Sequence, residues 1–240
     1  MKTRLWLADC PWNFNDRKVT RKDNPGKKPK FGIGVQRRYS AGTMSNADLA
    51  CLGPNISSQS TPDAYLLMWA VMPLLDVALA TMDAWGFDYK TTPFTWVKTT
   101  KNGKLFKGPG AYTLSNTEVI LLGRRKGAKR LWHSNAKGCY KPCSVIMEPH
   151  PRGADGKIIH SRKPEIFHQE IEKWLFPYLG DDMMAVELFA TQRREGWTCL
   201  GHALTGTMIQ DDLRTLGRRN ALDELTRLSE EMGLYDGNVD

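Results

Sequence analysis

Seven short, strongly apolar segments alternate with amphipathic or polar stretches along this 240-residue chain. Unbroken apolar runs of this length are typical of strands that are covered on both faces, as in a parallel sheet flanked by helices. The pattern therefore predicts an α/β fold around a central, largely parallel sheet. The expected strands are Arg4–Ala8, Ala64–Ala70, Phe87–Val97, Thr117–Leu122, Ser144–Met147, Met184–Phe189 and Thr198–Leu200.

Helices are expected between these strands. One covers Pro73–Trp85, because proline suits a first helical turn and Gly86 suits its end. A second covers Pro164–Leu175 and gathers its apolar side chains on one face, as a helix that packs on a sheet does. Ser45 and Asp48 have the spacing of a capping box and predict a short helix that begins at Ser45.

The length suits one main domain, which we place over residues 1–206, with an appended acidic helical segment over 207–240. In that segment apolar residues recur at helical spacing over Ile209–Met232, with Gly217 as a candidate break. Its helix would either pack on the body or dock a partner in a homo- or hetero-oligomer.

Charge is distributed unevenly along the chain. Lys and Arg total 34 against 26 Asp and Glu, a net charge of +8. Residues 208–240 carry eight acidic and four basic residues, so the remainder has 30 basic and 18 acidic residues and a net charge of +12. A body this basic favours a polyanionic partner, of which nucleic acid is the commonest. A basic surface without such a partner is the alternative.

Several other classes of protein are disfavoured. The chain begins without the apolar core of a signal peptide and has no membrane-length apolar run, so we expect a soluble cytoplasmic protein. Its five cysteines fit free thiols in a reducing compartment. His133, Cys139 and Cys143 lack a second ligand pair, so no metal site is expected.

Two basic segments are candidate phosphate-binding elements. Residues 15–38 form a long segment without periodicity, which we interpret as a mobile loop, and 124–130 place five cations in seven residues directly after a strand. Both would flank the site and contact the nucleic-acid backbone, although solvated faces are the alternative. The candidate residues are Arg17, Lys18, Lys27, Lys28, Arg37, Arg38, Arg124, Arg125, Lys126, Lys129 and Arg130.

The first strand ends at Asp9, which Cys10, Pro11 and Trp12 follow. Ligands of open α/β sheets bind beyond the carboxyl ends of the strands. There, a carboxylate and a neighbouring backbone carbonyl can accept both N–H groups of a nucleobase amine and direct its lone pair toward a methyl donor. Trp12 would stack on the base, and Trp69 would line the same pocket unless it is an ordinary core residue. Alternatively, Asp-x-Pro only starts a turn and Trp12 fills a gap.

Asp9-Cys10-Pro11-Trp12 resembles the Asp-Pro-Pro-Trp motif of the MT-A70 family, the N6-adenine methyltransferases that use S-adenosylmethionine, in particular its DNA-directed bacterial or phage-like branch. Three further segments match the family in its order. They are Gly110–Gly123 with Glu118, His160–Glu165, and Glu187–Ala190 followed by Gly196-Trp197 and Gly201. Together the four segments extend from Leu5 to Leu204, and four in order are far more specific than one.

The resemblance implies a Rossmann-like methyltransferase domain in permuted order, with the catalytic strand first and the cofactor strand last. It implies S-adenosylmethionine as cofactor and S-adenosylhomocysteine as product. Lys163 at a helix start would hold the cofactor's carboxylate, and Glu187 in a buried strand would be costly without a ligand partner. The alternatives are a solvated lysine and a strand glutamate with a local partner. The implied cofactor-binding residues are Asp9, Lys163, Glu187, Phe189, Ala190, Thr191, Gln192 and His202.

This chain departs from the family pattern at several positions. Cys10 replaces the first proline of the motif, which keeps the backbone carbonyl and adds a thiol that the chemistry does not need. Thr191 and Gln192 stand where many members have arginines, and His202 stands where asparagine is common.

The leading hypothesis is methylation of adenine N6 in DNA, because the body shows no added RNA-binding module. N6-adenosine methylation of RNA, cytosine-N4 methylation of DNA and a non-catalytic nucleic-acid-binding subunit of the same fold are the alternatives.

Overall fold

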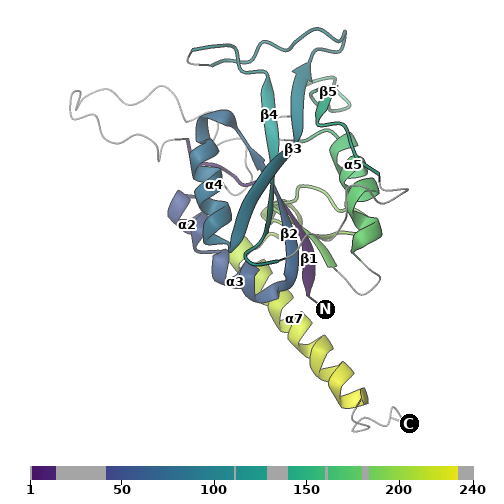
Figure 1. Cartoon of the computed structure of the whole chain (residues 1–240). Coiled ribbons are helices and arrows are strands. Elements are labelled where there is room, and N and C mark those ends of the chain that lie inside the picture. The colour runs from purple at the N-terminus through teal and green to yellow at the C-terminus, as the bar shows by residue number, and fades with distance from the viewer. Residues whose placement is uncertain are drawn as a thin grey trace, which may run out of the picture.

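The computed structural model describes residues 2–14, 42–110, 112–128, 140–159, 162–179 and 184–231. At its centre lies a seven-stranded sheet in the order β5-β3-β4-β2-β1-β6-β7 (Figure 1). The strands are β1 (Thr3–Ala8), β2 (Ser60–Ala70), β3 (Phe87–Thr99), β4 (Thr117–Arg125), β5 (Val145–Pro149), β6 (Met184–Leu188) and β7 (Thr198–Leu200).

The sheet is parallel apart from β4. β1 pairs in parallel with β2 and β6, β6 with β7, and β3 with β5, whereas β4 is antiparallel to both β2 and β3. The carboxyl ends of six strands therefore lie at one edge of the sheet, together with the amino end of β4. We call this the carboxyl edge. It is the edge where ligands of open α/β sheets bind.

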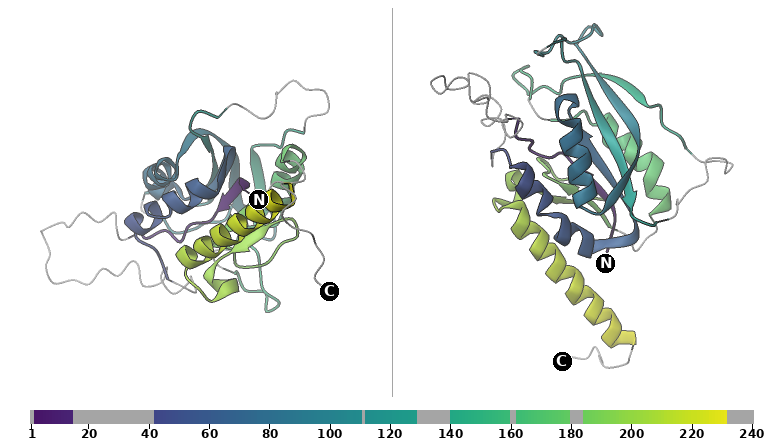
Figure 2. Two further views of the ribbon diagram at one scale, coloured as in Figure 1. Left: turned by 90° about the horizontal axis from the view of Figure 1, so that it is seen from below. Right: turned by 60° about the vertical axis from the view of Figure 1, so that its left-hand side comes forward.

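Helices cover both faces of the sheet. α4 (Leu75–Ala84), after the short η1 (Met72–Leu74), lies on one face, beside α2 (Asn46–Ala50) and α3 (Gly53–Gln59). α5 (Ile166–Leu175), followed by η2 (Phe176–Tyr178), lies on the other face, as both views of Figure 2 show. Two apolar cores result, one on each face of the sheet. The α/β architecture predicted from the sequence is thus confirmed.

The predicted elements agree well with those observed. All seven expected strands are present, with bounds that differ by at most four residues. Ser45 caps α2 as predicted, with its hydroxyl accepting the Asp48 N–H at 3.0 Å. α3 and the short α6 (His202–Thr205) were not predicted. α3 is too short and its Gly53-Pro54 start too turn-like to give a clear period.

The C-terminal helix α7 (Ile209–Glu231) confirms the helical segment, and it runs through Gly217 without a break. Ile209, Leu213 and Leu216 are buried in the core, whereas the later leucines of the helix are exposed. Figure 1 shows this second part extending away from the sheet. Docking of a partner there stays a prediction. Among the described residues, no helix combines the length and apolar character needed to span a membrane.

Candidate active site

Four charged side chains meet at the carboxyl edge because of how the strands are aligned. Asp9 directly follows β1, and Glu187 of β6 pairs in register with Leu7 of β1. Glu118 is the second residue of β4, whose reversed direction brings its amino end to this edge. Lys163 precedes α5, whose start also lies at this edge because the helix precedes a parallel strand.

These side chains also share one face of the sheet. Successive side chains of a strand point to opposite faces, so residues two apart lie on the same side. Leu5 and Leu7 belong to the core that α5 covers, and Asp9 continues their series. Glu118 continues the series of Ile120 in the same way, and Glu187 that of Ala185. The polar site is therefore the outer end of the apolar core beneath α5.

Lys163 is the centre of the resulting ion-pair network. Its Nζ lies 2.9 and 2.8 Å from the two carboxylate oxygens of Asp9 and 3.3 Å from Oε2 of Glu118. The other oxygen of Glu118 accepts a hydrogen bond from Lys98 Nζ at 2.5 Å. Lys163 Nζ also lies 5.2 Å from the ring centroid of Trp69, a cation–π contact. Asp9, Lys163, Glu118 and Lys98 thus form a chain of contacts in which carboxylates and cations alternate.

Burial and charge shift the two carboxylates in opposite directions. Burial raises the pKa of Asp9, and Glu118 and Glu187 add to this effect, although Lys163 opposes it. Burial acts on Glu118 in the same sense, but Lys163 and Lys98 together hold its pKa below the usual value. Glu118 is therefore the firmly ionised member, and Asp9 is the carboxyl group whose protonation is most easily changed.

Backbone hydrogen bonds fix the segment that follows Asp9, and the role of its carbonyl as an acceptor for an amine stays a prediction. Cys10 O accepts the Trp12 N–H at 2.9 Å, and Pro11 O accepts the Met44 N–H at 2.9 Å. A carbonyl oxygen has two lone pairs, so Cys10 O retains acceptor capacity beside Asp9. Burial, and next the charge of Asp9, raise the pKa of the Cys10 thiol well above its ordinary value. Cys10 is therefore a neutral thiol and not a nucleophile.

Trp12 and Trp69 are both buried, with 3% and 2% of their surface exposed. The Trp12 indole N–H donates to Trp69 O at 3.3 Å, which ties the loop after β1 to the end of β2. Trp69 packs edge-on against Phe167 of α5, so its core role is established. Stacking of Trp12 on a base stays a prediction, since its described contacts are all structural.

Glu187 has local partners, the alternative that the sequence left open. Its Oε2 lies 3.3 Å from His168 Nε2 and 3.3 Å from Arg194 Nε. Arg194 also pairs with Glu165, so the start of α5 is joined to the turn after β6. Glu187 is nevertheless not enclosed, since 12% of its side chain is exposed at the carboxyl edge. Cofactor binding by Glu187 stays a prediction.

The turn after β6 is held in an uncommon conformation. Phe189 has a φ of 62°, in the left-handed region that non-glycine residues rarely adopt. Ala190 N–H donates to Leu200 O at 2.9 Å and fixes the turn against β7. A Cβ on Gly201 would lie 2.5 Å from Ala190 O and 2.7 Å from Ala190 N. Backbone in strained conformations is concentrated at functional sites, which agrees with the predicted role of this turn.

We expect Gly201→Ala to destabilise the fold by about 1–3 kcal/mol, because the added methyl group would meet backbone that the β6–β7 pairing holds in place. Thermal unfolding measures the change. Gly217→Ala is the matched control, since the nearest atoms there are 3.6 Å away and alanine favours a helix. An equal loss of stability in both variants would contradict this explanation.

The other predicted cofactor residues lie along the same turn. Thr191 is exposed, and Gln192 donates to Glu165 Oε2 at 3.3 Å. Nδ1 of His202 is 3.3 Å from Thr207 O, at the start of α6. The predicted residues at 15–38, with Lys129 and Arg130, lie outside the described residues. Those in 15–38 are Arg17, Lys18, Lys27, Lys28, Arg37 and Arg38.

The expectation that Arg124, Arg125 and Lys126 flank Asp9 is wrong. They end β4, and because β4 is antiparallel its end lies at the opposite edge of the sheet. Arg124 pairs with Tyr65 of β2, four residues and about 13 Å from Trp69 along the strand. Arg125 donates to Ser57 Oγ at 2.8 Å, and Lys126 pairs with Asp83 at 2.8 Å. A contact with nucleic acid there stays a prediction.

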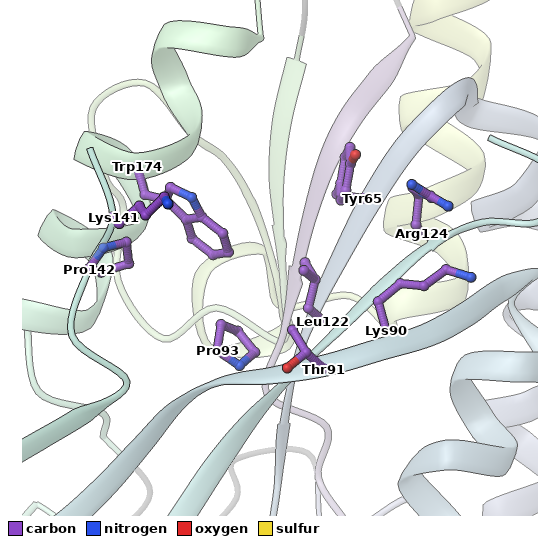
Figure 3. Close-up of a pocket in the computed structure, with 9 residues that line it drawn as sticks. All are labelled: Tyr65, Lys90, Thr91, Pro93, Leu122, Arg124, Lys141, Pro142 and Trp174. Atoms are coloured by element: carbon purple, nitrogen blue, oxygen red, sulfur yellow. The ribbon is translucent and has the colours of Figure 1, made fainter. Parts of the chain in front are cut away.

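Arg124 instead lines a cavity of about 470 Å³ beneath the far end of α5 (Figure 3). Figure 3 shows Tyr65, Arg124 and Lys90 on one side and Trp174, Lys141 and Pro142 on the other. No member of the Asp9 network lines this cavity, so it is separate from the candidate active site.

Sequence reasoning missed the roles of Lys98, His168 and Arg194 and assigned none to Glu118. The signal for the two strand residues was available. Phe94, Trp96 and Lys98 are two residues apart and therefore lie on one face of their strand. Glu118 lies on the same face of its strand as Ile120. Each of the two charged residues is thus the polar end of a buried row of side chains. Their meeting depends on strand direction, which apolar patterning does not encode.

Known proteins resemble this chain over most of its length. The family model MT-A70 matches residues 4–203. The chain is also similar to "Type II methyltransferase M.MunI" from Mycoplasma sp, with 28% identity over 221 residues, which covers 87% of this chain and 81% of the relative. The match contains the whole ion-pair network and ends before α7. This chain is therefore a methyltransferase that belongs to the MT-A70 family.

Proposed function

We propose that the protein transfers a methyl group from S-adenosylmethionine to the N6 amino group of adenine in DNA. The observation that carries the proposal is the pair of acceptors at the end of β1. The Asp9 carboxylate and Cys10 O are adjacent in the chain, and both lie where ligands of such sheets bind. Together they would accept both N–H hydrogen bonds of the amine.

These acceptors address the chemical difficulty of the reaction. The lone pair of an exocyclic amine is delocalised into the purine ring, which makes the amine a weak nucleophile. Hydrogen bonds from both N–H groups to fixed acceptors orient the lone pair out of the ring plane and stabilise the positive charge that develops on nitrogen. After transfer, the surplus proton would pass to Asp9, whose burial raises its pKa and makes it the better proton acceptor.

The residues present also fit the cofactor. A methionine moiety carries an ammonium and a carboxylate group, and Asp9 and Lys163 offer one group of the opposite charge to each. In the described network these two side chains satisfy each other instead, at 2.8 Å. Glu187, at the end of the neighbouring strand, would accept hydrogen bonds from ribose hydroxyls. When bound, the cofactor supplies an electrophilic methyl group on sulfonium.

Product analysis tests the proposal directly. The purified protein is incubated with isotopically labelled S-adenosylmethionine and either duplex DNA or RNA, and the nucleic acid is then digested to nucleosides for mass spectrometry. We expect labelled N6-methyldeoxyadenosine. Label in N4-methyldeoxycytidine would identify cytosine as the target, and label only in RNA would identify RNA as the substrate. If calorimetry detects no heat of cofactor binding, the protein is a non-catalytic subunit.

The pH dependence of the reaction should depend on Glu118. Asp9 must be ionised to accept hydrogen bonds, so kcat/KM falls as pH drops through its raised pKa. Glu118→Gln removes a negative charge that raises this pKa and leaves Lys163 to Asp9 alone. We therefore expect the acid limb to move to lower pH.

Rate profiles for the wild type, Glu118→Gln and Glu148→Gln measure this shift. Glu148 lies on β5 outside the ion-pair network, so its variant should retain the wild-type acid limb. An unchanged limb in Glu118→Gln, or a shift to higher pH, would show that Glu118 does not act on Asp9.

A further inference from the structure

A groove of about 590 Å³ lies beyond the carboxyl end of β3. Three of its lining side chains are cationic, and none of the described residues that line it is acidic. They are Thr100, Lys101, Asn102, Lys104, Arg152 and Gly156. We propose that this groove binds the phosphodiester backbone of the DNA that flanks the target base, a role that rests on the proposed function.

The groove has a fixed shape because two turns form its walls. In the first, Thr100 N–H donates to Lys104 O at 2.7 Å and Gly103 N–H donates to Thr100 O at 2.9 Å. In the second, the Arg152 guanidinium donates to Gly156 O at 2.6 Å, and Gly153 N–H donates to Lys157 O at 2.9 Å. These bonds hold the backbone of both turns and the Arg152 side chain before a ligand arrives, which lowers the entropy cost of binding.

An aromatic contact joins the two walls. The ring of His150, just before the second turn, has its centroid 5.0 Å from that of Trp96, before the first turn, and 4.9 Å from that of Phe106, after it. Thr99 also pairs in register with Pro149, so β3 and β5 enter the two turns side by side. The lysines of the first turn and Arg152 of the second therefore line one groove.

The cations of the groove are available to a ligand. Within the described part of the chain, neither Lys101 nor Lys104 forms an ion pair, and both are exposed. Asp155 is the acidic residue of the second turn, and it is engaged by Lys157 at 3.4 Å. The groove therefore carries a net positive charge beside solvent, which suits a phosphate ligand.

The groove also lies at a useful distance from Asp9. β3 is three strands from β1, which at the usual strand spacing is about 14 Å across the sheet. The registers place Asp9 level with Phe94, so Thr100 lies six residues, about 20 Å, further along β3. The two displacements combine to about 24 Å, the length of about seven base pairs of B-form DNA. Lys98, which bonds Glu118 of the network, is two residues before Thr100 of the groove. Figure 1 shows the β3–β4 connection extending beyond this edge. DNA whose base reaches Asp9 would thus pass its flanking backbone through the groove.

Binding of a fluorescent mixed-sequence DNA duplex, measured by anisotropy at several salt concentrations, tests the inference. The groove variant is Lys101→Ala/Lys104→Ala/Arg152→Ala. We expect at least a tenfold weaker affinity at about 0.1 M salt and a slope of log K against log salt smaller by about 2–3, since each phosphate contact contributes about 0.9. KM for DNA should rise while kcat at saturating DNA stays near the wild-type value.

The matched control is Lys90→Ala/Arg214→Ala/Arg218→Ala, which removes the same charge from exposed side chains elsewhere. It should retain most of the affinity and slope. If DNA affinity falls equally in both variants, or does not fall in the groove variant, the proposal for the groove is overturned. The proposed function fails separately, when the wild type binds DNA without methylating adenine. If the groove variant loses affinity for an RNA probe but not for DNA, the groove binds RNA instead.

Discussion

Asp9→Asn should lower kcat for methyl transfer by at least about 10²-fold at saturating cofactor and DNA. Asparagine has nearly the same shape, but it lacks the negative charge that stabilises the developing cation on the amine, and removal of one such preorganised group typically costs this much. The fold should survive, because Glu118 still pairs with Lys163 at 3.3 Å. Single-turnover rates and thermal unfolding measure the two effects.

Asp63→Asn is the control for Asp9→Asn. Asp63 lies on β2 and also pairs with a cation, since Arg4 donates to it at 2.5 Å, but it is near the opposite edge of the sheet. This variant should lose stability without loss of kcat. Full activity of Asp9→Asn would remove the basis of the proposed reaction.

Lys163→Met should affect both stability and cofactor affinity. It leaves Asp9 and Glu118 facing each other without the cation between them, and removal of one partner from a fully buried pair typically costs about 3–5 kcal/mol. The side chains of Lys163 and Asp9 are 11% and 22% exposed, so solvent reduces the expected loss to about 1–3 kcal/mol. Cofactor affinity should fall at least about tenfold, since a charge-assisted contact to its carboxylate is lost.

A double variant separates these two effects. Asp9→Asn/Lys163→Met removes both charges of the pair, so its free energy of unfolding should exceed that of Lys163→Met alone, although activity stays low. Lys163→Arg keeps the charge and should retain most of the stability. Additive destabilisation in the double variant would mean that the 2.8 Å contact contributes nothing to the fold.

The position of Asp9 could be predicted from sequence because it requires only local information. A buried run followed by an acidic residue and proline identifies a strand end, and strand ends of α/β sheets form the binding edge. The contact of Lys163 with Asp9 could not be predicted, since 154 residues separate them and only the placement of α5 beneath the sheet brings them together.

The direction of β4 accounts for the main error and the main omission. Its apolar core, Val119–Leu122, reads the same whether the strand is parallel or antiparallel. Assuming the parallel direction placed Arg124 at the binding edge, whereas the observed direction places Glu118 there. The direction of this one strand therefore brings a carboxylate to the site, where cations were expected.

The reversed strand also separates two parts of the molecule that can change independently. Lys98 N–H donates to Asn116 O at 2.8 Å, which closes the β3–β4 ribbon just before its connection begins. Insertions or deletions between Thr99 and Thr117 would therefore alter the reach of the connection while the spacing of Lys98 and Glu118 stays constant. Exchange of the whole connection would in this way leave the contact between Lys98 and Glu118 in place.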